Sequence, residues 1–111
     1  MRLKQRADFL RAAKGAKAAM PGLVLQARAG PAPEAAARVG FTVTRKVGNA
    51  VARNRAKRRL RAIADALLPG KSRAGFDYVL VGRTATLTRN FSALREDLQK
   101  ALARVHQENS K

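Results

Sequence analysis

Apolar residues recur along the chain at strand-like and helix-like spacings. From Leu23 to Ala29, and again from Val39 to Thr44, larger apolar residues alternate with polar or small ones. Such alternation predicts half-buried strands, and we expect these two segments to form an antiparallel pair across a long connection. The segment from Phe76 to Val81 is almost continuously apolar, which predicts a strand covered on both faces.

Three other segments have helical spacing. A short helix is expected from Arg6 to about Lys14, and a last helix from Asn90 or Phe91 onward. The longest helix should begin after Asn49, a favourable N-cap, and end near Leu68, before a Pro-Gly pair. At about 100° per residue, its apolar residues form one stripe: Ala52, Ala56, Leu60, Ile63 and Leu67.

These elements predict an α+β fold, a single-domain α–β sandwich with a small sheet, in the order α-β-β-α-β-α. A chain of 111 residues is long enough for one modest core. We therefore expect residues 1–111 to be one domain, with residues 1–5 and 107–111 flexible.

The formal net charge of +17 changes this picture most. A chain this basic repels itself and favours polyanionic partners, of which nucleic acid is the first candidate and an anionic membrane surface the second. No stretch approaches the roughly 18 apolar residues of a membrane span, and no apolar region follows the basic N-terminus as in a secretory signal. With no cysteine, disulfides are excluded, and we expect a cytoplasmic protein with no membrane partner.

The charge is concentrated on the longest helix and the turn before it. Eight of the seventeen residues from Arg45 to Arg61 are Lys or Arg, and none is acidic. A solvated charged helix normally mixes signs in i,i+4 pairs, so this unmixed array favours contact with a phosphate backbone. A strand precedes the helix, whereas a helix-turn-helix protein has a helix there. Structured RNA is therefore the favoured partner.

The sequence shows no active site of its own. Glu96 and Asp97 are adjacent on a helix and are expected to be solvated, and the single histidine, His106, is expected to be exposed. No serine has a visible base partner, so we predict no catalytic residue in this chain. Whether the protein holds an ordered metal ion is left open.

One run of residues resembles a known family closely. The 24 residues from Arg38 to Arg61, with Arg53-Asn54-Arg55 at their centre, are similar to the signature of the bacterial ribonuclease P protein subunit. The rest of the chain agrees in order, with an early Asp8-Phe9 helix and a strand at 77–81.

The resemblance implies a subunit of an endoribonuclease that removes the 5′ leader of precursor tRNA. The catalytic site is then in the RNA subunit, which also binds most of the Mg²⁺. The implied partners are the catalytic RNA and precursor tRNA with its leader, with no obligate protein partner. It also implies a left-handed β-α-β crossover around the basic helix.

The resemblance assigns two groups of binding residues. Those expected to bind the catalytic RNA are Arg53, Asn54, Arg55, Lys57, Arg58 and Arg61. Those expected to bind the leader are Phe9, Gln26, Thr44, Arg45 and Lys46. Two further aromatic residues frequent in the family are replaced here by Ala13 and Gln26, so leader binding should depend more on charge.

Two other classes of protein remain open from the residues alone. A small ribosomal or other structural RNA-binding protein could be equally basic. A DNA-binding regulator is disfavoured because nothing indicates a dimer with paired recognition helices. An open hollow beside Phe9 would favour the leader-binding subunit over a purely structural protein.

Overall fold

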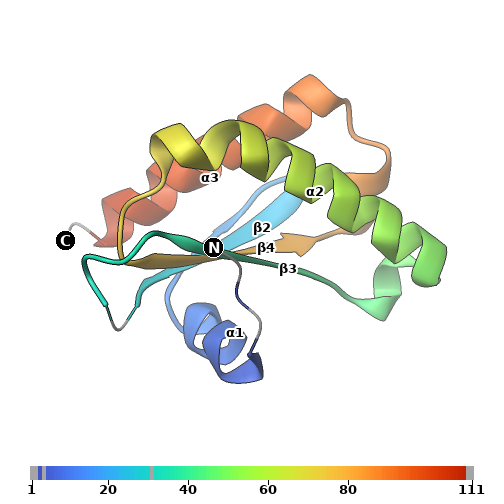
Figure 1. Cartoon of the computed structure of the whole chain (residues 1–111). Helices are drawn as coiled ribbons and strands as arrows, with labels where there is room; N and C mark the ends of the chain where they lie inside the picture. Colours follow the sequence, from blue (N-terminus) through green and yellow to red (C-terminus); the bar gives the residue numbers. More distant parts are fainter. Residues whose placement is uncertain (1–2, 4, 31, 110–111) are drawn as a thin grey trace.

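One four-stranded sheet separates a short helix from two long ones (Figure 1). The computed structural model describes residues 3, 5–30 and 32–109. The helices of this part are α1 (Arg6–Ala13), α2 (Ala50–Lys71) and α3 (Phe91–Asn109). The strands are β1 (Ala16–Ala19), β2 (Leu23–Ala29), β3 (Arg38–Val43) and β4 (Phe76–Gly82), and single 3₁₀ turns, η1 (Arg45–Val47) and η2 (Thr84–Leu87), follow β3 and β4.

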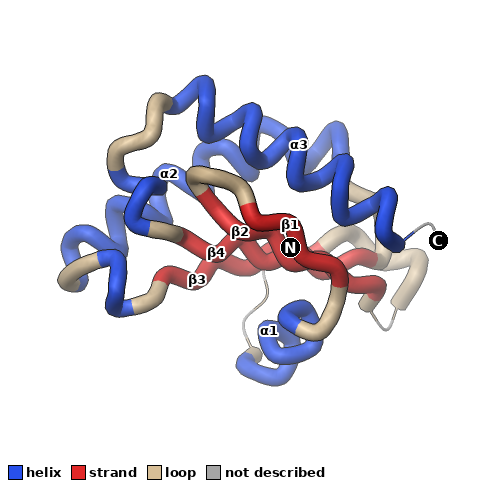
Figure 2. The backbone as a smooth tube through the Cα atoms, turned by 180° about the vertical axis from the view of Figure 1, so that it is seen from behind, coloured by secondary structure: helices blue, strands red, loops and turns tan. Residues whose placement is uncertain are grey.

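The core lies between the sheet and the two long helices. Leu25 and Leu80 from the sheet, Leu60 from α2 and Leu98 from α3 are fully buried in it. A smaller cluster on the opposite face joins α1 to the sheet through Leu3, Ala12 and Val79. Both views place α1 alone on that face (Figures 1 and 2). The predicted α+β sandwich is confirmed.

The sheet contains one strand more than the sequence indicated, and its pairing differs. Its order is β1-β2-β4-β3. The expected antiparallel pair of β2 and β3 is wrong, because β4 lies between them, antiparallel to β2 and parallel to β3. The unpredicted strand β1 pairs with β2 at the edge of the sheet.

The connection from β3 through α2 to β4 has the unusual hand. In Figure 1, β3 and β4 run in the same direction, with β3 nearer the viewer and α2 above them. Viewed along the direction of these two strands, the chain passes from β3 over α2 to β4 in a counter-clockwise sense. The crossover is therefore left-handed. Most β-α-β units have the opposite hand.

Helix α2 begins as predicted and ends later. The side chain of Asn49 accepts a hydrogen bond of 2.9 Å from the Ala52 N–H, which caps the helix. The helix continues through Pro69 to Lys71, three residues beyond the expected end at Leu68. Its buried residues are Ala56, Leu60, Ile63, Ala64 and Leu68, so the stripe is close to the predicted one, with Ala52 and Leu67 only half-buried.

The two ends of the chain were expected to be flexible. Residues 1, 2, 4, 110 and 111 lie outside the described residues. Leu3 is buried, and its N–H donates a 2.8 Å hydrogen bond to the Val39 carbonyl. This contact brings the segment before α1 to the edge strand β3.

Candidate nucleic-acid interface

Four of the residues predicted to bind the catalytic RNA share one side of α2. At about 100° per residue, Asn54, Lys57, Arg58 and Arg61 fall within roughly 100° of arc. Asn54, Arg58 and Arg61 are exposed and Lys57 is half-buried. Because α2 is an ordered, capped helix, these groups form a rigid array along one edge of the molecule.

The other arginines of this stretch lie elsewhere on the helix. Arg55 is exposed beyond Arg58, and Arg53 is half-buried near the start of the packed face. Arg59 donates a side-chain hydrogen bond to the Arg89 carbonyl. It therefore faces the connection between η2 and α3.

A hollow of about 550 Å³ lies between α1 and the open face of the sheet. Phe9 and Gln26, both predicted to bind the leader, line it. Ala13, which the sequence marked as a replaced aromatic position, also lines it. The sequence did not single out the other lining residues, which are Arg6, Leu10, Phe41, Thr42, Val79 and Val81. Leu10, a large apolar residue of this short helix, stays 53% exposed, which only the structure shows.

The hollow and the basic side of α2 meet at β3, the edge strand. A smaller hollow of about 230 Å³ there is lined by Phe9 and Phe41 together with Lys57 and Arg61. The Arg61 guanidinium lies 5.7 Å from the centre of the Phe41 ring, within cation–π range. Aromatic faces and cations that are far apart in the sequence are thus adjacent in the fold, as single-stranded nucleic-acid sites require.

The remaining predicted leader residues lie at the end of β3. Thr44, Arg45 and Lys46 are exposed in the turn that leads into α2. Of the described residues, those lining the Phe9 hollow include Thr42 but none of these three. They extend the basic surface from the sheet to the start of α2.

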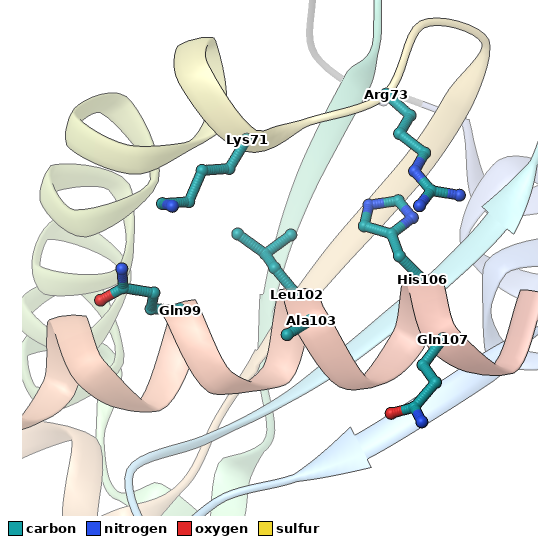
Figure 3. A pocket seen from close by; sticks show the side chains of 7 residues that line it. All are labelled: Lys71, Arg73, Gln99, Leu102, Ala103, His106 and Gln107. Atoms are coloured by element: carbon teal, nitrogen blue, oxygen red, sulfur yellow. The ribbon is translucent and has the colours of Figure 1, made fainter.

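A second basic hollow, of about 620 Å³, lies between the end of α2 and α3 (Figure 3). Lys71 and Arg73 border it, and His106 forms part of its wall. The expectation that His106 is exposed is wrong. It is 7% exposed, and its Nε2 lies 2.8 Å from the Tyr78 hydroxyl. Burial, and then the charge of Arg73, lower the pKa of His106, so the imidazole is held neutral.

The acidic residues whose side chains the structure describes divide into exposed and buried ones. Glu34, Asp65 and Glu96 are exposed, whereas Asp8, Asp77 and Asp97 are buried. The expectation that Asp97 is solvated is wrong, because its carboxylate accepts hydrogen bonds from the Gly22 N–H and the Arg89 guanidinium. The exposed carboxylates are too few to neutralise the basic surface.

Residues 3, 5–30 and 32–109 contain no group of three or more His, Asp or Glu side chains that could hold a metal ion. Across the same residues, no helix combines the length and the apolar character needed to cross a membrane.

Comparisons with known proteins agree with this geometry. The family model described as Ribonuclease P matches residues 1–106. A protein of Ruegeria pomeroyi named ribonuclease P protein component is 51% identical over 106 residues, covering 94% of this chain and 85% of that protein. A protein of the same name from Paramagnetospirillum magneticum is 54% identical over 108 residues, covering 94% and 81%. The solved RNase P protein from Thermotoga maritima has a TM-score of 0.78 at 31% identity, covering 95% of this chain and 97% of that one.

Proposed function

The chain belongs to the family of ribonuclease P protein components, and we propose that it binds the catalytic RNA through α2 and the precursor-tRNA leader through the hollow beside α1. Members of this family are subunits of the enzyme that matures the 5′ end of tRNA, whose catalytic activity lies in the RNA. The family assignment removes the two alternatives considered from the sequence, a ribosomal protein and a DNA-binding regulator.

The proposal depends chiefly on the junction at β3. Lys57 and Arg61 of the basic helix line the same small hollow as Phe9 of α1. An RNA strand leaving the aromatic hollow would therefore pass directly to the cations of α2. The residues proposed for the catalytic RNA are Arg53, Asn54, Arg55, Lys57, Arg58 and Arg61, and those for the leader are Phe9, Gln26, Thr44, Arg45 and Lys46.

The chain's own contribution is binding and orientation. Guanidinium groups suit phosphates because of their planar, two-pronged geometry, and the Phe9 ring offers a surface on which a base can stack. Mg²⁺, bound mainly by RNA in the holoenzyme, supplies the charge stabilisation for phosphodiester cleavage. We place the assembly in the cytoplasm, with RNA rather than another protein as its partner.

Reconstitution tests the function directly. Adding the chain to a bacterial ribonuclease P RNA and precursor tRNA at low Mg²⁺ should increase the rate of 5′ cleavage. A mature tRNA carrying no leader should gain no affinity from the protein. If the chain failed to enhance cleavage while binding the RNA normally, the proposed function would be wrong.

Leader binding in this protein should depend on charge more than on stacking. Ala13 and Gln26, which stand where the family often has aromatic residues, both line the hollow. Replacing Ala13 by Phe should strengthen leader-dependent affinity by up to the 1–3 kcal/mol that one stacked base contributes, about 5- to 150-fold. It should leave the affinity for the catalytic RNA unchanged.

A salt series separates charge from stacking. The leader-dependent affinity of the unchanged chain should fall steeply with salt, because it derives from phosphate contacts. The gain from Ala13→Phe should persist at high salt. A shallow salt dependence for the unchanged chain would contradict the proposal that charge dominates.

A further inference from the structure

Two buried carboxylates on the α1 face of the sheet share one arginine. The Nε and Nη2 atoms of Arg38, on β3, each donate a 2.8 Å hydrogen bond to Asp77 on β4. Nη2 also lies 3.4 Å from the carboxylate of Asp8, on α1, which pairs with Arg11 as well. Asp8 is 6% and Asp77 4% exposed. We refer to Asp8, Arg38 and Asp77 as the ionic cluster.

The ionic cluster lies in line with the hollow between α1 and the sheet, which we call the leader hollow. Along the parallel β3–β4 pair, Arg38 is opposite Asp77, Gly40 opposite Val79 and Thr42 opposite Val81. Alternate residues of a strand share a face, so these three pairs form successive rows beneath α1. The first row is ionic, the second supports Phe9, and the third lines the hollow.

Phe9 fits closely onto the middle row. A Cβ atom added at Gly40 would lie 2.6 Å from Cζ of the Phe9 ring, closer than real contacts allow. The ring therefore rests directly on the β3 backbone. Asp8 directly precedes Phe9 on α1, so the contact between Asp8 and Arg38 is made one residue away from this ring.

Apart from the ionic cluster, the side-chain hydrogen bonds described between α1 and the sheet include one of 3.3 Å, from the Arg28 guanidinium to the Arg11 carbonyl. Helix α1 has eight residues and no side-chain cap at its N-terminus, and isolated helices of this length are marginal. Its apolar contacts with the sheet involve the small cluster of Leu3, Ala12 and Val79, with Phe9 and Val81 packed against it. Such contacts are not directional, whereas a charge-assisted hydrogen bond is. Asp77 holds the Arg38 guanidinium by a two-pronged contact, and the free side of that fixed group faces Asp8 of α1.

We propose that the ionic cluster positions α1, so that Phe9 stays on Gly40 and the leader hollow keeps its width. Asp8 and Arg38 are then positioning residues for the single-stranded leader of precursor tRNA, acting through Phe9. A buried ion pair can be replaced as a whole at little cost in stability, although removal of one partner is destabilising, so we assign this cluster a geometric role. The inference rests on the leader site proposed above.

The test measures leader discrimination in the reconstituted holoenzyme. This quantity is the affinity for precursor tRNA with a leader of several nucleotides, divided by the affinity for mature tRNA. The variants are Asp8→Asn, which keeps the side-chain volume, and Arg38→Gln, with Arg38→Lys as the conservative change. Thermal unfolding and affinity for the catalytic RNA are measured for each.

Asp97 provides a matched control. It is 3% exposed and accepts hydrogen bonds from an arginine, Arg89, and from the Gly22 N–H. It lies on α3, on the other side of the sheet from α1 (Figure 1). Asp97→Asn should therefore lower stability as Asp8→Asn does while leaving leader discrimination unchanged.

We expect Phe9→Ala to lower leader discrimination by about 5- to 150-fold, the contribution of one stacked base. Asp8→Asn and Arg38→Gln should lower it at least about fivefold, with Arg38→Lys between Arg38→Gln and the unchanged chain. Adding Asp8→Asn to Phe9→Ala should cost nothing more, because both act through the same ring. Affinity for the catalytic RNA should stay within about twofold, since α2 is untouched.

Three results would overturn the inference. Equal losses of discrimination in Asp8→Asn and Asp97→Asn would mean that the cluster acts only through general stability. An unchanged ratio in Asp8→Asn, with a large loss in Phe9→Ala, would refute the positioning role and leave the leader site intact. No loss in Phe9→Ala would refute the leader site itself, and the positioning role with it. If Arg38→Gln does not fold, Asp8→Asn decides alone.

Discussion

At the scale of single residues, Arg58 and Leu60 are two positions apart on α2 and have opposite environments. Leu60 is fully buried and Arg58 is exposed. Leu60→Ala should lower the free energy of unfolding by about 2–5 kcal/mol, because it leaves a cavity in the core. Arg58→Ala should weaken binding of the catalytic RNA and change stability by less than about 0.5 kcal/mol.

Denaturant unfolding and RNA titration of both variants check this pair of expectations. Leu60→Ala should bind the RNA normally under conditions in which it remains folded. An equal loss of stability in the two variants would show that Arg58 packs against the protein, contrary to its exposed position.

His106 should make stability depend on pH. Its ordinary pKa is about 6.5, and burial among Tyr78, Arg73 and Lys71 lowers the pKa in the folded protein. The unfolded chain therefore takes up a proton first. This contribution to stability is complete above about pH 6.5 and is lost as the pH falls through that value toward the folded pKa.

Urea unfolding between about pH 8 and pH 5 measures this effect. His106→Gln removes the titrating group and should flatten the profile in that range. The other titrating groups are the same in both proteins and should affect both alike. If the variant lost as much stability over the same range as the unchanged chain, His106 would not be responsible.

The buried positions of His106 and Asp97 could not be predicted from local pattern. The partner of His106, Tyr78, is 28 residues away, and Asp97 accepts from Gly22, 75 residues away. The apolar stripe of α2 was predictable because helical periodicity is local. Polar residues are buried only where the fold supplies a partner, and that information is tertiary.

At the scale of elements, α2 depends on its N-cap. Asn49→Ala removes the hydrogen bond to the Ala52 N–H and should cost about 1 kcal/mol. Fraying of the first turn would also loosen Arg53 and Asn54, so affinity for the catalytic RNA should fall several-fold.

Asn90 serves as the control for this prediction. Its side chain accepts a 2.9 Å hydrogen bond from the Ser92 N–H at the start of α3. Asn90→Ala should lower stability by a similar amount without affecting RNA binding. Calorimetry and RNA titration of the two variants would reveal a general effect of stability if both lost affinity equally.

The order of elements was largely predictable, but the sheet topology was not. Periodicity located β2, β3, β4 and the three helices, whereas the alanine-rich β1 has too little contrast between its faces. The pairing of β2 with β3 was inferred because these strands are consecutive in the sequence. In the structure β4 lies between them, and it reaches this position through the left-handed crossover over α2. Pro69 did not end α2, which continues to Lys71.

The same limit applies to the candidate site. The motif from Arg53 to Arg61 located the basic helix, but its meeting with Phe9 at β3 required the fold. Arg38 lies within the run that resembles the family, yet nothing in the sequence indicated that it bridges Asp8 and Asp77. Long-range ion pairs have no sequence period from which they could be recognised.

At the scale of the whole molecule, the charge should make stability and affinity respond to salt in opposite directions. A net charge of +17 is confined within a radius of gyration of 13.0 Å. The Debye length is about 30 Å at 0.01 M salt and about 8 Å at 0.15 M. Added salt therefore screens repulsion across the whole molecule, while the buried ionic cluster is little affected.

We expect the melting temperature to rise by several degrees between about 0.01 M and 0.15 M NaCl, since a relief of about 1 kcal/mol shifts a domain near this size by about 4–8 °C. Affinity for the catalytic RNA should fall instead. If the five cations among the proposed contacts each neutralise one phosphate, the slope of log K against log salt is about −4. Arg58→Ala should reduce that slope by about one and also lessen the stabilisation by salt, because it removes one repelling charge. If salt lowered the melting temperature, stabilising ion pairs rather than repulsion would dominate the electrostatics of the free protein. RNA binding would then not relieve repulsion between its cations.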